Sequence, residues 1–90
     1  MTVITAGRDE VRDITILVEA RRAARSGRGR ELRRQVGLSQ TEMGSFCGVT
    51  ATAISLWESG KRTPRGAAAY RYGQLIQLLE RRARSDETED

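Results

Sequence analysis

Helix stop and start signals recur at a short, fixed interval in the middle of this chain. Gly37 comes two positions before Ser39, and Gly48 comes two positions before Thr50. The second pair lies 11 residues after the first. Glycine ends a helix because it adopts positive φ at no steric cost, and Ser or Thr begins one by accepting a backbone N–H. Glu42 completes a capping box with Ser39. The interval predicts two short helices and a tight turn, over residues 40–47 and 51–59.

The residues inside these two predicted helices suit a steep crossing of one helix over the other. Gly44 places a small residue where the two backbones approach, and Gly48 supplies the positive φ that the turn requires. Val49 anchors the turn, and Ile54 and Trp57, three positions apart, give the second helix one buried face. The pattern therefore predicts a helix-turn-helix unit.

The opposite face of the second helix carries short or polar side chains. Its members are Ala51, Thr52, Ser55, Leu56 and Ser59. A face of short side chains lets a helix enter the major groove of DNA, which is about 12 Å wide. This face is the first candidate for a nucleic-acid contact.

The segment before this unit predicts two more helices. The first begins with Asp9 as its N-cap, and its apolar face holds Val11, Ile14, Leu17, Val18 and Ala24. Because residues 14–18 are rich in β-branched side chains, a strand stays open as an alternative there. After Ser26, Gly27 and Gly29 interrupt the pattern, a helix over residues 29–36 turns Leu32 and Val36 inward.

A long helix is predicted after Pro64, over residues 65–84. Its inward positions are Ala68, Tyr72, Leu75, Ile76 and Leu79. Residues 85–90 hold four acids and no base, so we expect a disordered tail. The chain then divides into a helical extension (1–27), an all-α helix-turn-helix domain (28–84) with a long C-terminal helix, and an acidic tail (85–90).

Basic charge is concentrated on both sides of the helix-turn-helix unit. Residues 21–34 contain seven arginines and one acid, and residues 59–79 contain four cations and no acid. The net charge is +4, which suits a polyanionic partner such as nucleic acid or an acidic membrane surface. One run alone is typical of a solvated surface, but two runs flanking one motif favour a nucleic-acid contact.

The chemistry-bearing residues argue against catalysis and metal binding. Cys47 is the single cysteine and histidine is absent, which excludes an intramolecular disulfide and a cysteine- or histidine-rich zinc site. The sequence has no paired acids at catalytic spacing and no glycine loop that would hold a phosphate. We therefore expect that the protein is not an enzyme and binds no cofactor. No apolar run approaches the roughly 20 residues that span a bilayer, so we expect a cytoplasmic protein without a membrane partner.

Beyond these physical features the sequence resembles a known family. The matching residues are Leu32-Arg33, Gly37-Leu38-Ser39-Gln40, Gly48-Val49, Ile54, Trp57-Glu58, Gly60-Lys61 and Pro64. Their spacing is similar to that of the Cro/CI-type (XRE-like) helix-turn-helix of small phage, prophage or actinobacterial regulators. The resemblance spans about residues 28–79 and implies an all-α domain that binds double-stranded operator DNA.

The resemblance assigns roles by position. It implies base contacts by Thr50, Ala51, Thr52, Ser55 and Leu56. It implies contacts to phosphates or the minor groove by Gln40, Thr41, Ser59, Lys61, Arg62, Arg65, Arg28 and Arg30. Arg33 and Glu58 fall where such domains pair an arginine with a glutamate.

Two positions depart from the family's pattern and thin the expected base readout. Ala51 and Leu56 stand where long amides or arginines often read bases. Hydrogen bonds would then come from Thr52 and Ser55, with methyl contacts to thymine. Further specificity would come from DNA shape or from an arginine arm in the minor groove, for which the arginines of residues 21–30 are the candidates.

These features predict a sequence-specific regulator of transcription, and one alternative function stays open. Because nothing after the domain has room for a small-molecule effector site, we expect a Cro-like repressor that occupies an operator and binds no small-molecule ligand. The alternative is an antitoxin or adaptor that grips another protein. A homodimer on DNA and a monomer on an asymmetric site both stay open.

Phe46 is an aromatic residue at a position that normally points outward. An exposed phenylalanine is expected to be covered by another apolar surface. Our hypothesis is that Val11, Ile14 and Leu17 pack near it, within one chain or across a dimer.

Overall fold

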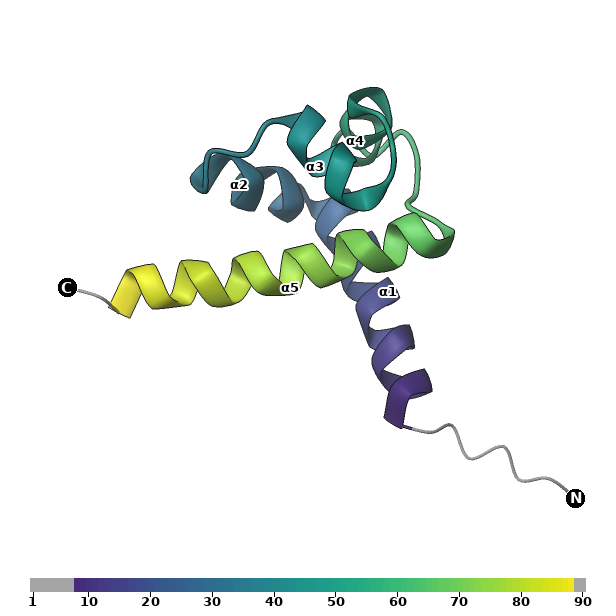
Figure 1. The fold of residues 1–90 in the computed structure, drawn as a ribbon, viewed down its shortest axis with the longest axis horizontal. Coiled ribbons are helices and arrows are strands. Elements are labelled where there is room, and N and C mark those ends of the chain that lie inside the picture. The colour runs from purple at the N-terminus through teal and green to yellow at the C-terminus, as the bar shows by residue number, and fades with distance from the viewer. Residues whose placement is uncertain (1–7, 89–90) are drawn as a thin grey trace, which may run out of the picture.

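The computed structural model describes residues 8–88, and this part of the chain forms five α-helices and no strand (Figure 1). The helices are α1 (Arg8–Ser26), α2 (Arg28–Gln35), α3 (Gln40–Cys47), α4 (Ala51–Glu58) and α5 (Gly66–Thr88). The predicted all-α class is confirmed.

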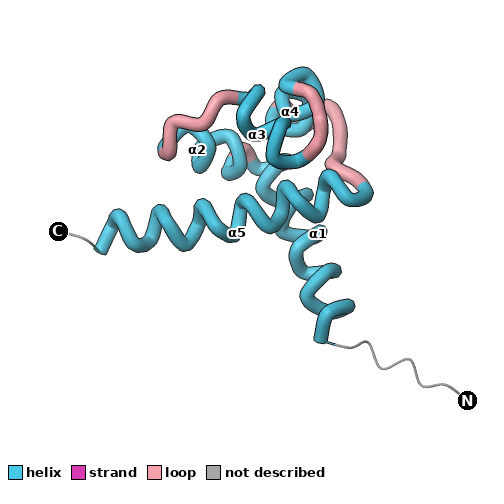
Figure 2. The backbone as a smooth tube through the Cα atoms, viewed as in Figure 1, coloured by secondary structure: helices cyan, strands magenta, loops and turns pink. Residues whose placement is uncertain are grey.

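Two long helices form the frame on which the three short ones lie. Helix α1 crosses α5, and α2, α3 and α4 gather on one side of that crossing (Figure 1). Short loops connect α2, α3 and α4, which we call the compact group (Figure 2). No helix of the described chain is long and apolar enough to cross a bilayer.

The predicted starts of α3 and α4 are confirmed. The Ser39 Oγ accepts a hydrogen bond from the Glu42 backbone N–H at 3.0 Å, and the Glu42 carboxylate accepts one from the Ser39 N–H at 2.9 Å. The Thr50 Oγ1 accepts from the Ala53 N–H at 3.1 Å. The Ser39 N–H lowers the pKa of Glu42 because it stabilises the carboxylate. The caps thus fix where both short helices begin.

Two glycines set the geometry of the turn, as predicted. Gly48 ends α3 with φ of 78°, a conformation that costs a side-chain-bearing residue energy. A Cβ on Gly44 would lie 2.5 Å from the Val49 carbonyl oxygen, which is backbone and cannot swing aside. Helices α3 and α4 therefore approach as closely as they do because position 44 lacks a side chain.

The core lies between the compact group and the α1–α5 frame. The predicted residues Leu32, Ile54, Trp57 and Tyr72 are buried, together with Met43, which was not predicted. The rings of Trp57 and Tyr72 meet edge to face with centroids 5.1 Å apart, a favourable arrangement for aromatic pairs. This contact joins α4 to α5.

The inward face predicted for α1 is wrong. Val11 and Ile14 are more than half exposed, Val18 is 49% exposed, and Leu17 is only half-buried. The buried positions of α1 are Ile16, Ala20, Ala23 and Ala24, of which only Ala24 was predicted. The physical reason is the close crossing with α5, where a Cβ on Gly73 would collide with the backbone and side chain of Ile16. Gly73 and the three alanines allow that crossing around Ile16, whereas Val11, Ile14 and Val18 lie outside it.

Other predicted boundaries also need correction. Helix α1 begins at Arg8, so Asp9 lies in its first turn and is not its N-cap, and residues 14–18 are helical and not a strand. Helix α5 continues to Thr88, so residues 85–88 are helical where disorder was expected. Residues 1–7 and 89–90 of the predicted arm and tail lie outside the described residues. Phe46 keeps 49% of its surface exposed, and Val11 and Ile14 are 54% and 61% exposed, so the stripe does not cover Phe46 within one chain.

The Tyr72 hydroxyl is buried against Gly29 and has no hydrogen-bond partner in the described chain. Burial raises the pKa of this phenol, so it stays protonated. We expect Tyr72→Phe to stabilise the protein by up to about 1–3 kcal/mol, because it removes an unsatisfied buried group and keeps the ring contact with Trp57. The urea concentration at the midpoint of unfolding measures this gain in stability. A large loss of stability in Tyr72→Phe would show that the hydroxyl is bonded.

Candidate nucleic-acid interface

A buried ion pair fixes the C-terminal end of α4. The Arg33 guanidinium of α2 donates from Nε to the Glu58 Oε2 at 2.6 Å and from Nη2 to Oε1 at 3.0 Å. Its Nη1 donates to the Leu38 carbonyl at 2.9 Å. The two side chains are only 11% and 3% exposed. The expected Arg33–Glu58 pair is therefore present, and its two parallel bonds fix both position and orientation.

Gln40 joins the same carboxylate from α3. Its side-chain Nε2 donates to the Glu58 Oε1 at 3.1 Å. One carboxylate of α4 thereby holds α2 and α3 as well. The amide that the resemblance assigned to a phosphate uses one of its two N–H donors here. The backbone N–H groups of Gln40 and Thr41 lie in the first turn of α3, where N–H groups lack intrahelical partners.

The outward face of α4 is composed as predicted. Thr52 and Ser55 are exposed, and Ala51 and Leu56 are half-buried at its edges. The inward face is formed by Ile54 and Trp57, which are buried. No side chain longer than leucine extends from the outward face between residues 51 and 56, so the helix axis can approach a flat or grooved surface closely.

Two hydroxyl groups assigned to DNA already make local hydrogen bonds. The Thr50 Oγ1 accepts the Ala53 N–H, which leaves its own proton for donation to another group. The Ser59 Oγ donates to the Leu56 carbonyl at 3.2 Å. Because a phosphate needs a donor, Ser59 offers one only after its side chain rotates. Thr50 is thus the better placed of the two.

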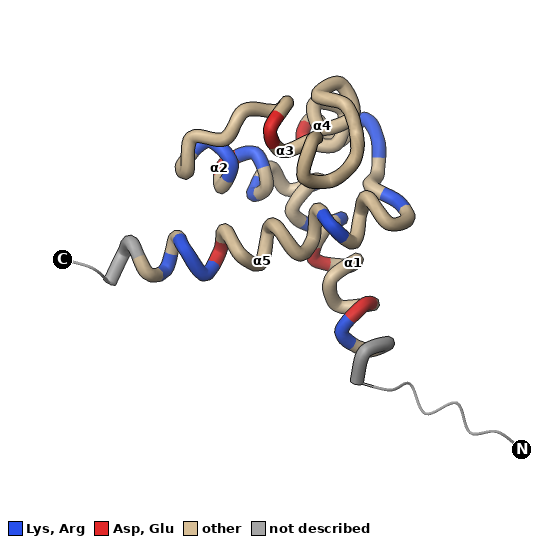
Figure 3. The backbone as a smooth tube through the Cα atoms, in the orientation of Figure 1, with Lys and Arg blue, Asp and Glu red and all other residues tan. Residues whose placement is uncertain are grey.

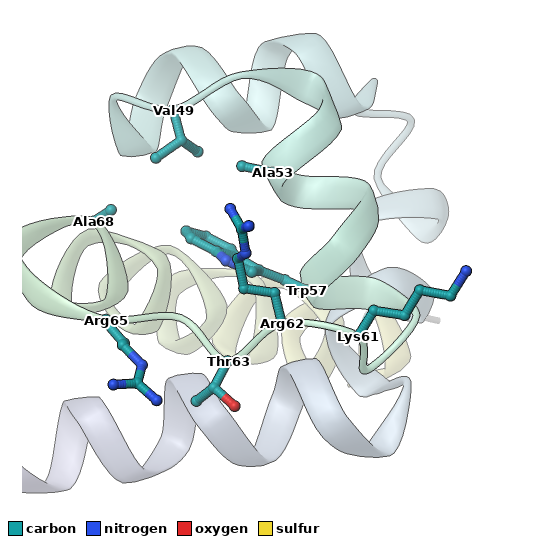
Figure 4. Close-up of a pocket in the computed structure, with 8 residues that line it drawn as sticks. All are labelled: Val49, Ala53, Trp57, Lys61, Arg62, Thr63, Arg65 and Ala68. Carbon is teal, nitrogen blue, oxygen red and sulfur yellow. The ribbon is translucent and has the colours of Figure 1, made fainter.

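The loop after α4 carries cations at a fixed place. The backbone N–H groups of Lys61 and Arg62 both donate to the Leu56 carbonyl, at 2.9 and 3.1 Å. Their side chains and that of Arg65 are exposed. A concavity of about 560 Å³ opens here, lined by Val49, Ala53, Trp57, Lys61, Arg62, Thr63, Arg65 and Ala68. In Figure 4 the Arg62 side chain points into it, and that of Lys61 points away.

Arg28, which was assigned to DNA, is engaged elsewhere. It donates from Nη2 and Nε to Glu80 of α5, at 2.7 and 3.1 Å, and from Nη1 to Glu31 at 2.6 Å. The arginine arm predicted for residues 21–30 is also wrong, since residues 21–26 end α1 and residues 28–30 begin α2. Helical backbone packed on α5 is not an arm that follows a minor groove. Arg30 remains exposed on α2.

Arg71 is a cation near the motif for which the sequence analysis proposed no role. It is exposed on α5, and its Nη1 lies 3.7 Å from where a Cβ on Gly48 would be, beside the turn between α3 and α4. Only the packing of α5 brings it there, so local pattern gave no signal. Its charge slightly opposes the effect of burial on Cys47, whose pKa burial raises to about 11. Cys47 is thus a buried thiol that stays protonated.

Charge is distributed unevenly over this surface. Lys and Arg mark α2, the loop after α4 and both halves of α5 (Figure 3). Three acids of this region are engaged, Glu58 with Arg33, and Glu31 and Glu80 with Arg28. No group of three or more potential metal ligands occurs among the described residues. What the arrangement offers is hydrogen-bonding hydroxyls on a narrow helix beside cationic side chains.

Fold and site together define a helix-turn-helix unit, with α3 and α4 as its two helices. A helix-turn-helix family model matches residues 30–78, more than half of the chain, and the chain belongs to this XRE/Cro/CI-type family. Neither a curated protein nor a solved structure matches the chain. The matched segment runs from α2 into α5, so α1 lies outside it.

We expect Arg33→Ala to destabilise the fold by about 3–5 kcal/mol, because it leaves the buried Glu58 carboxylate without its cation. Chemical denaturation followed by circular dichroism measures the change. Arg34→Ala, an exposed neighbour on α2, is the matched control and should change stability little. Equal effects of the two substitutions would contradict the structural role of the pair.

The Arg28–Glu80 pair predicts a loss of stability in acid. Hydrogen bonds from Arg28 hold the pKa of Glu80 below its ordinary value of 4.5. Its stabilising contribution is therefore complete above that value and is lost as the pH falls through the lowered pKa. We expect Glu80→Gln to lower the free energy of unfolding at neutral pH. The variant should then lose less stability than the wild type when the pH is lowered from neutral to acid. Asp13→Asn, at an exposed carboxylate of α1, is the control in the same denaturation series.

Proposed function

We propose that this protein is a sequence-specific regulator of transcription that occupies an operator in double-stranded DNA, with α4 in the major groove. The observation that carries the proposal is the outward face of α4, which has hydroxyls and short side chains and is held by the Arg33–Glu58 pair beside exposed cations. The family to which the chain belongs is a DNA-binding one.

The proposed division of labour follows the chemistry of each group. Thr52 and Ser55 hydrogen-bond base edges, and the methyl groups of Ala51 and Leu56 meet thymine methyls. Lys61, Arg62 and Arg65 contact phosphates on one flank, and the first turn of α3 contacts a phosphate on the other. Thr50 donates its hydroxyl proton at the start of α4. Few base contacts leave part of the specificity to DNA shape.

The mode of action we propose is passive occupation in the manner of a Cro repressor, in a bacterial or phage-infected cytoplasm, with residues 28–84 as the DNA-binding domain. A two-fold dimer would place two copies of α4 about one helical turn of DNA apart. The second candidate function is an antitoxin or adaptor. The exposed apolar residues Val11, Ile14 and Val18 along α1 favour it, and co-purification with the product of a neighbouring gene would distinguish it.

The base-reading role of α4 is tested with Thr52→Ala. We expect the protein to select a defined motif from random duplexes at near-physiological salt, and this substitution to lose about 1–3 kcal/mol of discrimination at one base position. Thr15→Ala, at an exposed threonine of α1 away from this surface, is the matched control. An unchanged motif after Thr52→Ala would mean that α4 is not the reader.

The phosphate role of the loop is tested separately with Lys61→Ala. We expect binding to weaken about equally for all sequences, and the slope of log K against log salt to fall by about 0.9. A loss confined to some sequences would contradict a backbone contact.

A further inference from the structure

We propose that α1 carries a second site for a DNA phosphate, formed by Arg21 and Arg25 beside the loop after α4. This inference rests on the proposed function and extends it to a helix that lies outside the family match. The site binds a phosphodiester of the duplex that flanks the base-reading helix. It lengthens the contact with DNA beyond the helix-turn-helix unit.

The site is a small concavity between two segments far apart in the sequence. Its volume is about 110 Å³, and its lining residues are Arg21, Ala24, Arg25, Trp57, Gly60, Arg62, Thr63 and Pro64. The Arg21 Nε donates to the Pro64 carbonyl at 3.3 Å, which ties α1 to the loop. The hydrogen bond uses one guanidinium nitrogen and leaves the two terminal ones for a ligand.

The charge at this concavity has one sign. Three arginines line it, and no Asp or Glu of the described chain does. None of these arginines forms an ion pair within the described residues. Glu19, an acid of α1, lines a different concavity with Arg81 and Arg84. The Arg62 side chain points into the larger concavity (Figure 4), so Arg21 and Arg25 supply the charge here. Because no acid neutralises them in this concavity, an anion that binds beside them is favoured.

The size and the side chains favour a phosphate over other ligands. Pockets for drug-sized molecules hold about 300–1,000 Å³, well above this volume. Guanidinium groups match phosphate oxygens with two parallel hydrogen bonds. A single phosphate group of a polymer fits both constraints.

The position of the concavity identifies the polymer as the DNA bound by α4. It shares Trp57, Arg62 and Thr63 with the larger concavity beside α4, so the two concavities adjoin, and we infer that they belong to one DNA-facing surface. That surface runs from the end of α4 to the last two turns of α1. A duplex seated on α4 therefore meets these arginines on the flank that also meets Lys61.

The test compares Arg25→Gln with Arg12→Gln in the full chain. Both positions are exposed on α1, and each change removes one positive charge. Arg12 lies nine positions before Arg21, which at about 100° per residue puts it on the opposite side of the helix. Arg25 makes no side-chain hydrogen bond or ion pair with the described residues, so Arg25→Gln keeps the fold, as circular dichroism would verify.

The readout is the salt dependence of binding to a fluorescein-labelled DNA duplex of mixed sequence, followed by anisotropy. Arg25→Gln is expected to lower the slope of log K against log salt by about 0.9, and Arg12→Gln to change it much less. Equal slopes for the two variants would overturn the α1 site while wild-type binding leaves the proposed function intact. Absence of any wild-type binding would overturn the proposed function and this site with it.

Discussion

The rest of this structure depends on the hydrogen bonds that the Glu58 carboxylate accepts. It accepts two hydrogen bonds from Arg33 of α2 and one from Gln40 of α3, and it lies at the last residue of α4. Three short helices of eight residues each have little packing of their own, because helices this short are marginal in water. A shared buried charge gives them a single relative arrangement, since any other arrangement leaves the carboxylate or the guanidinium without a partner.

That arrangement explains how a thin core presents a precise surface. Trp57 and Ile54 face inward from α4, so Thr52 and Ser55 must face outward, and the hydrogen bonds to the Leu56 carbonyl fix the basic loop beside them. Position along the helix and orientation about its axis are both determined before any DNA arrives. Because little ordering then remains to be done on binding, short hydroxyl side chains suffice for the base-reading role that we propose for them. The frame of α1 and α5 supports the unit through the contact of Trp57 with Tyr72.

The sequence predicted those features whose causes are local. Ser39, Thr50, Gly44 and Gly48 were identified because caps, close approaches and positive φ require particular residue types at particular positions. It did not predict which face of α1 is buried, since α1 has apolar residues on both sides and the choice depends on Gly73, in a helix that lies far along the chain. Nor did it predict that Arg28 pairs with Glu80, 52 residues away, which removes Arg28 from the proposed phosphate contacts. Both of these misses come from contacts with α5, because the sequence pattern predicts the buried face of α5 but not where α5 lies against α1 and α2.

The central claim is that α4 reads DNA in the major groove, and methylation interference tests it most directly. A duplex selected by the protein is methylated at guanine N7, which lies in the major groove, or at adenine N3, which lies in the minor groove. We expect N7 methylation within the motif to abolish binding and N3 methylation there to have little effect. Interference confined to adenine N3 would contradict it, because the protein would then be reading the minor groove.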